Sequence, residues 1–117
     1  MSILTDDFFA ALAHPLRLRM LMLLQQEGEL CVCELTHTLE VSQPMVSRHL
    51  AQLREAGLVA DRRQGLWIYY RLHPELPEWA SQVLSETARG VGQQAPFAED
   101  RKLLQHMPNR PDGRCCA

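Results

Sequence analysis

The spacing of hydrophobic residues predicts three helices in the first third of the chain. The pattern over residues 6–13 fits a short helix. Pro15 then opens a second one, because the first turn of a helix does not need the missing proline N–H. This second helix is expected to run to about residue 26 and to end at Gly28. Its inward face would carry Leu16, Met20, Leu23 and Leu24. Residues 30–39 fit a further short helix.

The next segment predicts a helix-turn-helix. Residues 40–42 have the composition of a turn, and Ser42 is a good N-cap for a helix over residues 43–56, whose first turn tolerates Pro44. Gly57 supplies the C-terminal stop. The buried face of this helix is expected to consist of Val46, Leu50 and Leu53. Two short helices joined by such a tight turn are typical of a DNA-binding motif.

The composition then changes from helical to β-type. Residues 58–63 and 67–72 are rich in β-branched and aromatic side chains around a Gln-Gly-Leu turn, which predicts a β-hairpin. Residues 76–88 return to a helical pattern. Its apolar face would consist of Leu76, Trp79, Ala80, Val83, Leu84 and Thr87. The pattern weakens after Gly90, although residues 97–106 fit one more short helix.

The order of these elements predicts the fold. A helix-turn-helix followed directly by a basic hairpin is typical of a winged helix-turn-helix, a mainly α architecture with a β-hairpin wing (α+β). We expect residues 1–90 to form this DNA-binding and dimerisation domain. Residues 91–117 are expected to be a short, flexible C-terminal extension that carries Cys115 and Cys116. A chain of 117 residues buries a limited core, which favours a dimer.

The charge distribution supports nucleic-acid binding, although the total charge does not. The formal net charge is −2, yet residues 41–73 carry five Lys and Arg against two Asp and Glu. A local basic stripe is what contact with phosphates requires. An excess of this size also arises by chance clustering of charged residues. The charge count therefore favours DNA binding only together with the helix-turn-helix motif.

The same sequence is expected to belong to a cytoplasmic protein with no membrane partner. The most apolar stretch, residues 12–24, is interrupted by charged residues and by Pro15, so it does not fit a bilayer span. Asp6 and Asp7 stand where a signal peptide needs positive charge. In a reducing cytosol the four cysteines indicate metal ligands or redox thiols rather than disulfides.

The two DNA-contacting elements of this fold supply the candidate binding residues. The second helix of the motif would enter the major groove of double-stranded DNA with its early residues near the base edges. Its candidates are Ser42, Gln43, Ser47, Arg48 and, nearer the buried side, His49. The wing would place positive charge along an adjacent minor groove through Arg62, Arg63 and Gln64. The alternative for the wing is a solvated hairpin with ordinary surface arginines.

Several motifs resemble the arsenic-repressor branch of the ArsR/SmtB family of metal-responsive repressors. They cover roughly residues 6–88, and the cysteine motif inside the helix-turn-helix is the most specific. The matching segments are ELCVCEL (29–35), VSQPMVSRHL (41–50), LREAGL (53–58), DRRQGLW (61–67), YYRL (69–72) and LPEWA (76–80). The resemblance implies a homodimer built on the first helix and the helix at 76–88. It also implies a repressor, not an enzyme, that leaves the operator of an arsenic-resistance operon when As(III) or Sb(III) binds, with no organic cofactor.

Cys31 and Cys33 are the predicted ligands of this inducer. Residues i and i+2 of a helix point about 200° apart, because each step turns by about 100°. Both cysteines could then hold one ion only if the start of the helix bends. We therefore expect binding to distort this helix and to move the recognition helix off the DNA. The alternative is that both are small buried hydrophobic residues.

A third thiolate ligand is missing from the motif. Trivalent arsenic and antimony favour three sulfurs, and the fullest family motif has a cysteine where this chain has Thr36. The third ligand could be Cys115 or Cys116 or a solvent thiol, or two cysteines could suffice. The terminal pair could also bind an organic trivalent arsenical, form a vicinal disulfide or be inert.

Two other functions remain open at this point. Either cysteine pair could sense an oxidant or another soft ion such as cadmium, lead or bismuth. A small thiol reductase is the alternative from a different class, but no phosphate- or oxyanion-binding loop surrounds either pair. The spacing of the histidines along the chain does not match that of zinc ligands, so we do not expect them to form a zinc site.

Overall fold

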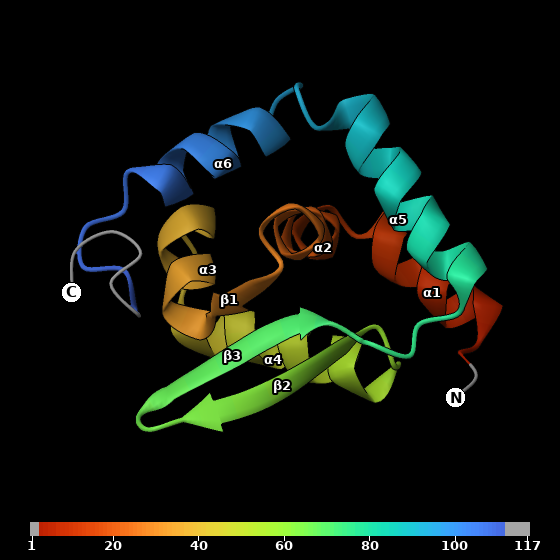
Figure 1. Ribbon diagram of the computed structural model, residues 1–117, viewed down its shortest axis with the longest axis horizontal. Helices are drawn as coiled ribbons and strands as arrows, with labels where there is room; N and C mark the ends of the chain where they lie inside the picture. Colours follow the sequence, from red (N-terminus) through yellow and green to blue (C-terminus); the bar gives the residue numbers. More distant parts are fainter. Residues whose placement is uncertain (1–2, 112–117) are drawn as a thin grey trace.

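A computed structural model describes residues 3–111 of the chain. Figure 1 shows five helices and a small sheet arranged around one central helix, α2, which is seen end-on. The elements in chain order are α1 (Thr5–Ala13), α2 (Pro15–Glu27), β1 (Glu29–Cys31), α3 (Val32–Leu39), α4 (Gln43–Glu55), β2 (Val59–Gln64), β3 (Trp67–Leu72), α5 (Glu78–Val91) and α6 (Phe97–Gln105). None of the described helices is long and apolar enough to cross a membrane.

The middle of the central helix is buried on every side. Five consecutive residues from Met20 to Leu24 are buried, whereas Leu16 is only partly so. The expected single inward face of α2 is therefore wrong in detail, because α3, α5, α6 and the sheet all pack around it. A helix segment that is apolar all round, as Met20 to Leu24 is, is expected where its whole circumference lies in the core.

The helix-turn-helix follows the sequence pattern closely. The backbone turns at Glu40, which has a φ of 58°, and Ser42 caps α4 by accepting a hydrogen bond from the Met45 N–H at 3.4 Å. The predicted inner face of α4 is confirmed, since it is buried at Val46, Leu50 and Leu53. The cap and this apolar face together fix which side of α4 is left to solvent.

The wing belongs to a three-stranded antiparallel sheet of order β1-β3-β2. Gly65, with a φ of 61°, makes the tight turn between β2 and β3, where a side chain would be strained. We expected residues 30–39 to be helical throughout, but Leu30 and Cys31 lie in β1 and pair with Tyr70 and Tyr69. This part of the helix prediction is wrong, because pairing with a distant strand decides the conformation there.

The segment after α5 packs onto the domain. Helix α6 contacts α3 and α2, and the Arg19 guanidinium on α2 pairs with Asp100 on α6 at 2.8 Å. The predicted helix at 97–106 thus matches α6. The division at residue 90 stays a prediction, and Cys115 and Cys116 lie outside the described residues.

Candidate DNA-binding surface and cysteine pocket

Cys31 and Cys33 bring their sulfur atoms together. The Cys33 thiol donates a hydrogen bond to the Cys31 sulfur at 3.1 Å. This is possible because Cys31 is not in the helix: it is the N-cap of α3, with an extended backbone of φ −76° and ψ 153°. The expectation that the pair must diverge on a helix is wrong, so the two thiols can face one ion without unwinding α3.

Glu34 fixes the backbone around this pair. Its Oε1 accepts a hydrogen bond from the Cys31 N–H at 2.7 Å, which closes the first turn of α3. Its Oε2 accepts one from Arg110 Nε at 2.7 Å. Both ionic side chains are buried. The start of α3 is therefore held from the core side by a hydrogen-bonded carboxylate.

Burial governs the acid–base state of Cys33. Loss of solvent, followed by the hydrogen bond to Cys31, raises the pKa of the Cys33 thiol to about 12. At neutral pH this side chain is a neutral thiol. A cation that needs a thiolate must therefore displace its proton.

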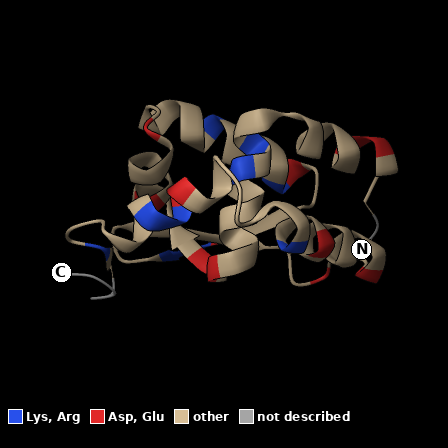
Figure 2. Ribbon diagram, turned by 90° about the horizontal axis from the view of Figure 1, so that it is seen from above, with Lys and Arg blue, Asp and Glu red and all other residues tan. Residues whose placement is uncertain are grey.

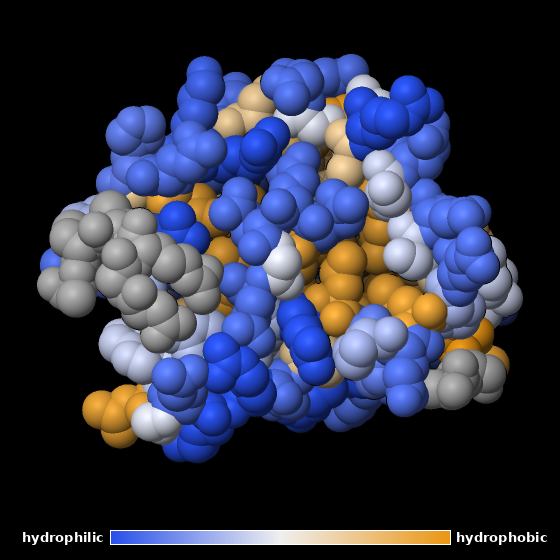
Figure 3. Space-filling model, viewed as in Figure 1, coloured by the Kyte–Doolittle hydropathy of each residue, from blue (hydrophilic) through white to orange (hydrophobic). Residues whose placement is uncertain are grey.

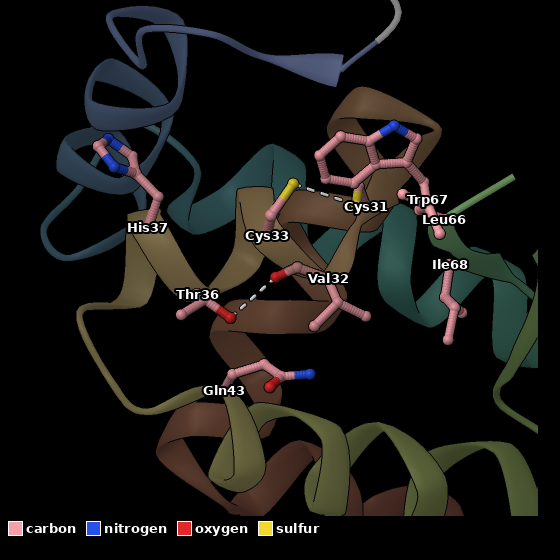
Figure 4. A pocket seen from close by; sticks show the side chains of 9 residues that line it. All are labelled: Cys31, Val32, Cys33, Thr36, His37, Gln43, Leu66, Trp67 and Ile68. Carbon is pink, nitrogen blue, oxygen red and sulfur yellow. Dashed lines mark hydrogen bonds between the residues drawn. The ribbon is translucent and has the colours of Figure 1, made fainter. Parts of the chain in front are cut away.

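A cavity of about 460 Å³ opens beside the two thiols (Figure 4). Three segments line it: α3 with its N-cap, the first residue of α4 and the hairpin. The lining residues are Cys31, Val32, Cys33, Thr36, His37, Gln43, Leu66, Trp67 and Ile68. In Figure 4 the cysteines lie toward one end and Gln43 toward the other. One cavity thus touches the thiols and both elements expected to meet DNA.

The third ligand position is not filled within the described part of the chain. Thr36 lines the cavity, but its hydroxyl donates to the Val32 carbonyl at 2.9 Å. His37 is exposed and points away from the sulfurs in Figure 4. Among residues 3–111, no three His, Cys, Asp or Glu side chains lie close enough together to hold a metal ion. The two thiols are the only soft donors at this place that the described residues supply.

The candidate residues of α4 differ in how accessible they are. Gln43 and Arg48 are exposed, Ser47 is half-buried, and the Ser42 hydroxyl is used as the helix cap. His49 is half-buried, and its Nδ1 accepts a hydrogen bond from Arg17 Nε at 2.9 Å. Arg48 is therefore the basic side chain that α4 presents to solvent near its N-terminal half.

His49 belongs to a small cluster at the junction of α1, α2 and α4. Its ring lies 4.8 Å from that of His14, centroid to centroid. Burial, and then the charges of Arg17, His14 and Arg48, lower the pKa of His49. Its imidazole is consequently neutral at pH 7 and acts as a hydrogen-bond acceptor.

The two wing arginines differ in how far other side chains of the protein hold them. Arg62 forms an ion pair with Glu29 of β1 at 2.7 Å, donates to Gln64 Oε1 at 2.7 Å and lies over the Tyr69 ring. Arg63 is exposed. In the view of Figure 2, basic residues are interspersed with acidic ones, and α1 begins with acidic side chains. The wing is therefore more constrained by internal ion pairs than a simple basic hairpin.

The exposed hydrophobic side chains of the described residues include those at the hairpin turn and between α1 and α5. Leu66, at the hairpin turn, is 93% exposed, and Figure 3 shows apolar atoms protruding there. Between α1 and α5, Phe9 (48% exposed) stacks on Trp79 (40% exposed) with ring centroids 6.2 Å apart. Exposed aromatic pairs of this kind are typical of interaction surfaces.

Sequence reasoning missed several residues at these sites. Trp67 lines the cysteine cavity and is 44% exposed, a position that the hairpin pattern alone does not reveal. Glu29, Arg17 and Arg110 carry long-range contacts that local spacing does not reveal. Glu34 could have been found, because it stands three residues after the N-cap, the spacing of a capping box.

Comparisons with known proteins agree with this architecture. Residues 14–61 match the family described as "Bacterial regulatory protein, arsR family". The chain is 54% identical over 105 residues to the arsenic resistance transcriptional regulator ArsR1 of Pseudomonas putida, covering 88% of this chain and 79% of that protein. It is 49% identical to the arsenical resistance operon repressor of Escherichia coli, covering 74% of each.

Solved structures show the same fold. HlyU from Vibrio cholerae superposes with a TM-score of 0.67 at 33% identity, covering 75% of this chain and 91% of that one. The homodimeric winged helix-turn-helix DNA-binding domain Mb0332 from Mycobacterium bovis superposes with a TM-score of 0.62 at 28% identity, covering 75% and 78%. The predicted winged helix-turn-helix is confirmed, and so is the prediction of a regulator rather than an enzyme. The chain therefore belongs to the arsR family of bacterial regulatory proteins and is a DNA-binding transcription regulator.

Proposed function

We propose that this protein is a cytoplasmic repressor of an arsenic-resistance operon, which leaves its operator when Cys31 and Cys33 bind trivalent arsenic or antimony. The arsenic-resistance regulators among its relatives support the choice of operon. The observation that carries the proposal is the 3.1 Å approach of the two sulfurs at the start of the helix-turn-helix. The sulfur atoms of paired cysteines are soft ligands, which thiophilic ions such as trivalent arsenic and antimony prefer.

On DNA, α4 lies in the major groove and the wing lies along the backbone. Base and phosphate contacts come from Ser42, Gln43, Ser47, Arg48 and His49 on one element and from Arg62, Arg63 and Gln64 on the other. Arg48 carries the largest share because it is basic and exposed. Arg62 must exchange its Glu29 partner for a phosphate to contribute.

The protein binds DNA as a homodimer joined through α1 and α5. The exposed pair Phe9 and Trp79 on these helices supplies apolar area that a second copy can cover. The related Mycobacterium bovis domain is described as homodimeric. A two-fold dimer presents two α4 helices to two half-sites of a palindromic operator.

The cavity couples inducer binding to release. The thiols, Gln43 of α4 and Trp67 of the wing line the same cavity, so binding at the sulfurs alters a space that both DNA-binding elements share. A ligand that fits better when α4 and the wing separate shifts the protein toward that arrangement. A nearly complete switch needs about 5.5 kcal/mol of differential binding. This route replaces unwinding of α3, which Glu34 resists.

A third sulfur, where one is used, comes from outside the described residues. Cys115 and Cys116 are the candidates in this chain, and a small cellular thiol is the alternative. The terminal pair is thus a testable part of the proposal rather than a requirement for it.

Fluorescence anisotropy of the protein on its own promoter DNA tests this function. Arsenite is titrated into the wild type, the Cys31→Ser/Cys33→Ser variant and a matched Cys115→Ser/Cys116→Ser control. Release in the wild type and the terminal variant, with retention by the inner variant, is expected. Release in all three would show that Cys31 and Cys33 are not required for sensing, and release in none would make arsenite the wrong ligand. Repeating the titration with cadmium and with hydrogen peroxide tests the soft-metal and oxidant alternatives.

A further inference from the structure

The C-terminal segment, residues 97–111, reaches back to the start of α3. Figure 1 shows α6 and the chain after it alongside α3. Two ion pairs with buried carboxylates join this segment to the rest of the domain. Asp100 on α6 pairs with Arg19 on α2 at 2.8 Å, and Arg110 pairs with Glu34 on α3 at 2.6 Å. The C-terminal segment is therefore part of the packed domain as far as Arg110.

Glu34 links Arg110 to the cysteine pair. Its Oε2 accepts a hydrogen bond from Arg110 Nε at 2.7 Å, and its Oε1 accepts one from the Cys31 N–H, also at 2.7 Å. Both ionic side chains are buried, and neither of them lines the cavity beside the thiols. Arg110 and Glu34 therefore act on the backbone of Cys31 and not on a group bound at its sulfur.

The backbone of Cys31 decides whether the two sulfurs meet. Cys31 is extended, with φ −76° and ψ 153°, whereas Cys33 lies in the first turn of α3, and their sulfurs are 3.1 Å apart. If both residues were helical, their side chains would point about 200° apart. The hydrogen bond from the Cys31 N–H to a fixed carboxylate holds the extended conformation. Because this conformation is ordered before an ion arrives, binding loses less conformational entropy.

Arg110 fixes the carboxylate of Glu34 in this position. A buried charge without a partner is unfavourable, so without Arg110 the Glu34 side chain would turn toward water or draw water in. Either change weakens its hold on the Cys31 N–H. The other carboxylate of the C-terminal segment, that of Asp100, accepts its hydrogen bonds from Arg19. The Arg19–Asp100 pair is therefore a matched control, because it anchors the same segment away from Cys31.

We propose that Arg110 is a positioning residue for the inducer site, which acts through Glu34 to hold Cys31 where its sulfur meets that of Cys33. The proposal rests on the proposed function, because it concerns the same cysteine pair. It makes the C-terminal segment part of the sensor, although Arg110 supplies no ligand. Loss of the Arg110 guanidinium then weakens arsenic binding and leaves the DNA-binding surface of α4 unchanged.

Arsenite binding and operator binding are measured separately for Arg110→Ala, Arg110→Lys and the control Arg19→Ala. All are made in a Cys115→Ser/Cys116→Ser parent, which leaves only the inner two of the four cysteines. Arg110→Ala should bind arsenite about tenfold more weakly, the effect of leaving the backbone of one residue unordered. Arg110→Lys should recover most of this loss, and Arg19→Ala should bind arsenite as the parent does. Operator affinity should be the same in all of them.

The Glu34→Leu/Arg110→Leu variant removes the same contact without leaving an unpaired buried charge. Replacing both partners of a buried ion pair by apolar residues is often neutral for stability, so this variant should fold. Because the Cys31 N–H has lost its carboxylate, it should bind arsenite as weakly as Arg110→Ala does. Parental arsenite affinity in the double variant, or an equal loss of affinity in Arg19→Ala, would overturn the inference.

The NMR signal of the Cys31 amide proton reports the same contact without arsenic. An amide that donates to a carboxylate resonates downfield, so this signal should move upfield in Arg110→Ala and in the double variant. It should keep its position in Arg110→Lys and in Arg19→Ala. An unmoved signal in Arg110→Ala would show that Glu34 holds Cys31 without Arg110, and the inference would be wrong. If the parent binds no arsenite, the proposed function fails, and the Cys31 signal alone decides whether Arg110 positions this residue.

Discussion

Arg110 donates a hydrogen bond from Nε to the carboxylate of Glu34 at 2.7 Å and forms an ion pair with it through Nη2 at 2.6 Å, across 76 residues of sequence. Both side chains are buried, and Glu34 also holds the Cys31 N–H. One carboxylate therefore joins the start of the cysteine helix to the segment that follows α6. Because the pair is desolvated, its net contribution to stability is small. Removing one partner, however, leaves an unpaired buried charge and is strongly destabilising.

Replacing Arg110 by Ala should destabilise the protein strongly. The variant leaves the Glu34 charge buried without its guanidinium, a change that costs about 3–5 kcal/mol. Urea denaturation followed by circular dichroism measures this loss. Arg54→Ala is the matched control, because it breaks the exposed ion pair with Asp61 and should cost about 1 kcal/mol or less. Equal losses in the two variants would contradict the special role of the buried pair.

Arg48→Ala should weaken operator binding and leave arsenic binding intact. Arg48 is exposed on α4, and loss of a base or phosphate contact costs about 1–3 kcal/mol of binding free energy. Anisotropy titrations at several salt concentrations measure both the affinity and its salt dependence. Lys102→Ala on α6 removes the same charge away from α4 and should bind DNA as the wild type does. Unchanged affinity of Arg48→Ala would remove Arg48 from the interface.

Local sequence signals identified the elements that depend on neighbouring residues. The Ser42 cap, the inner face of α4 and the Gly65 turn all follow from short-range rules, and each is found in the structure. Strand β1 was missed because Glu29 pairs with Arg71, and no local period encodes a partner that distant. The missed strand also explains why the two cysteines were wrongly expected to point apart on a helix, since it leaves Cys31 outside α3.

The contacts that define the candidate sites are the least predictable from sequence. Arg17 meets His49 across 32 residues, Arg62 meets Glu29 across 33, and Arg19 meets Asp100 across 81. Each side chain is individually typical of an exposed helix or strand. Only the packing of α2 against its surrounding elements brings the partners together.

Glu29→Gln should strengthen DNA binding. The substitution removes the carboxylate that holds Arg62 at 2.7 Å, so the guanidinium is released for a phosphate and one repulsive charge near the wing is lost. The expected gain is within about 1 kcal/mol, the usual size of an exposed ion pair. The Glu29→Gln/Arg62→Ala double variant is the control, and its affinity should fall below that of the wild type. No gain in the single variant would mean that Arg62 does not contact DNA.

The stability of the protein should fall in mild acid through His49. In the folded state the pKa of His49 is lowered, chiefly by burial and then by the charges of Arg17, His14 and Arg48. In mild acid the unfolded chain therefore binds a proton at His49 more readily than the folded chain does. This contribution to stability is complete above the unfolded pKa of about 6.5 and is lost as pH falls through and below it. Protonation of Nδ1 also breaks the hydrogen bond from Arg17.

His49→Gln tests this mechanism, because glutamine keeps an acceptor for Arg17 and does not titrate. Urea midpoints measured between about pH 5 and 7.5, a window chosen to span the unfolded histidine pKa, should fall less steeply for this variant than for the wild type. His106→Gln, which removes an exposed imidazole beyond α6, controls for the loss of any histidine. If the urea midpoint of His49→Gln falls with pH as steeply as that of the wild type, acid acts at another site. The same conclusion follows if His106→Gln reduces the pH dependence as much as His49→Gln does. The expected result would instead tie acid sensitivity to the contact that joins α2 to the recognition helix.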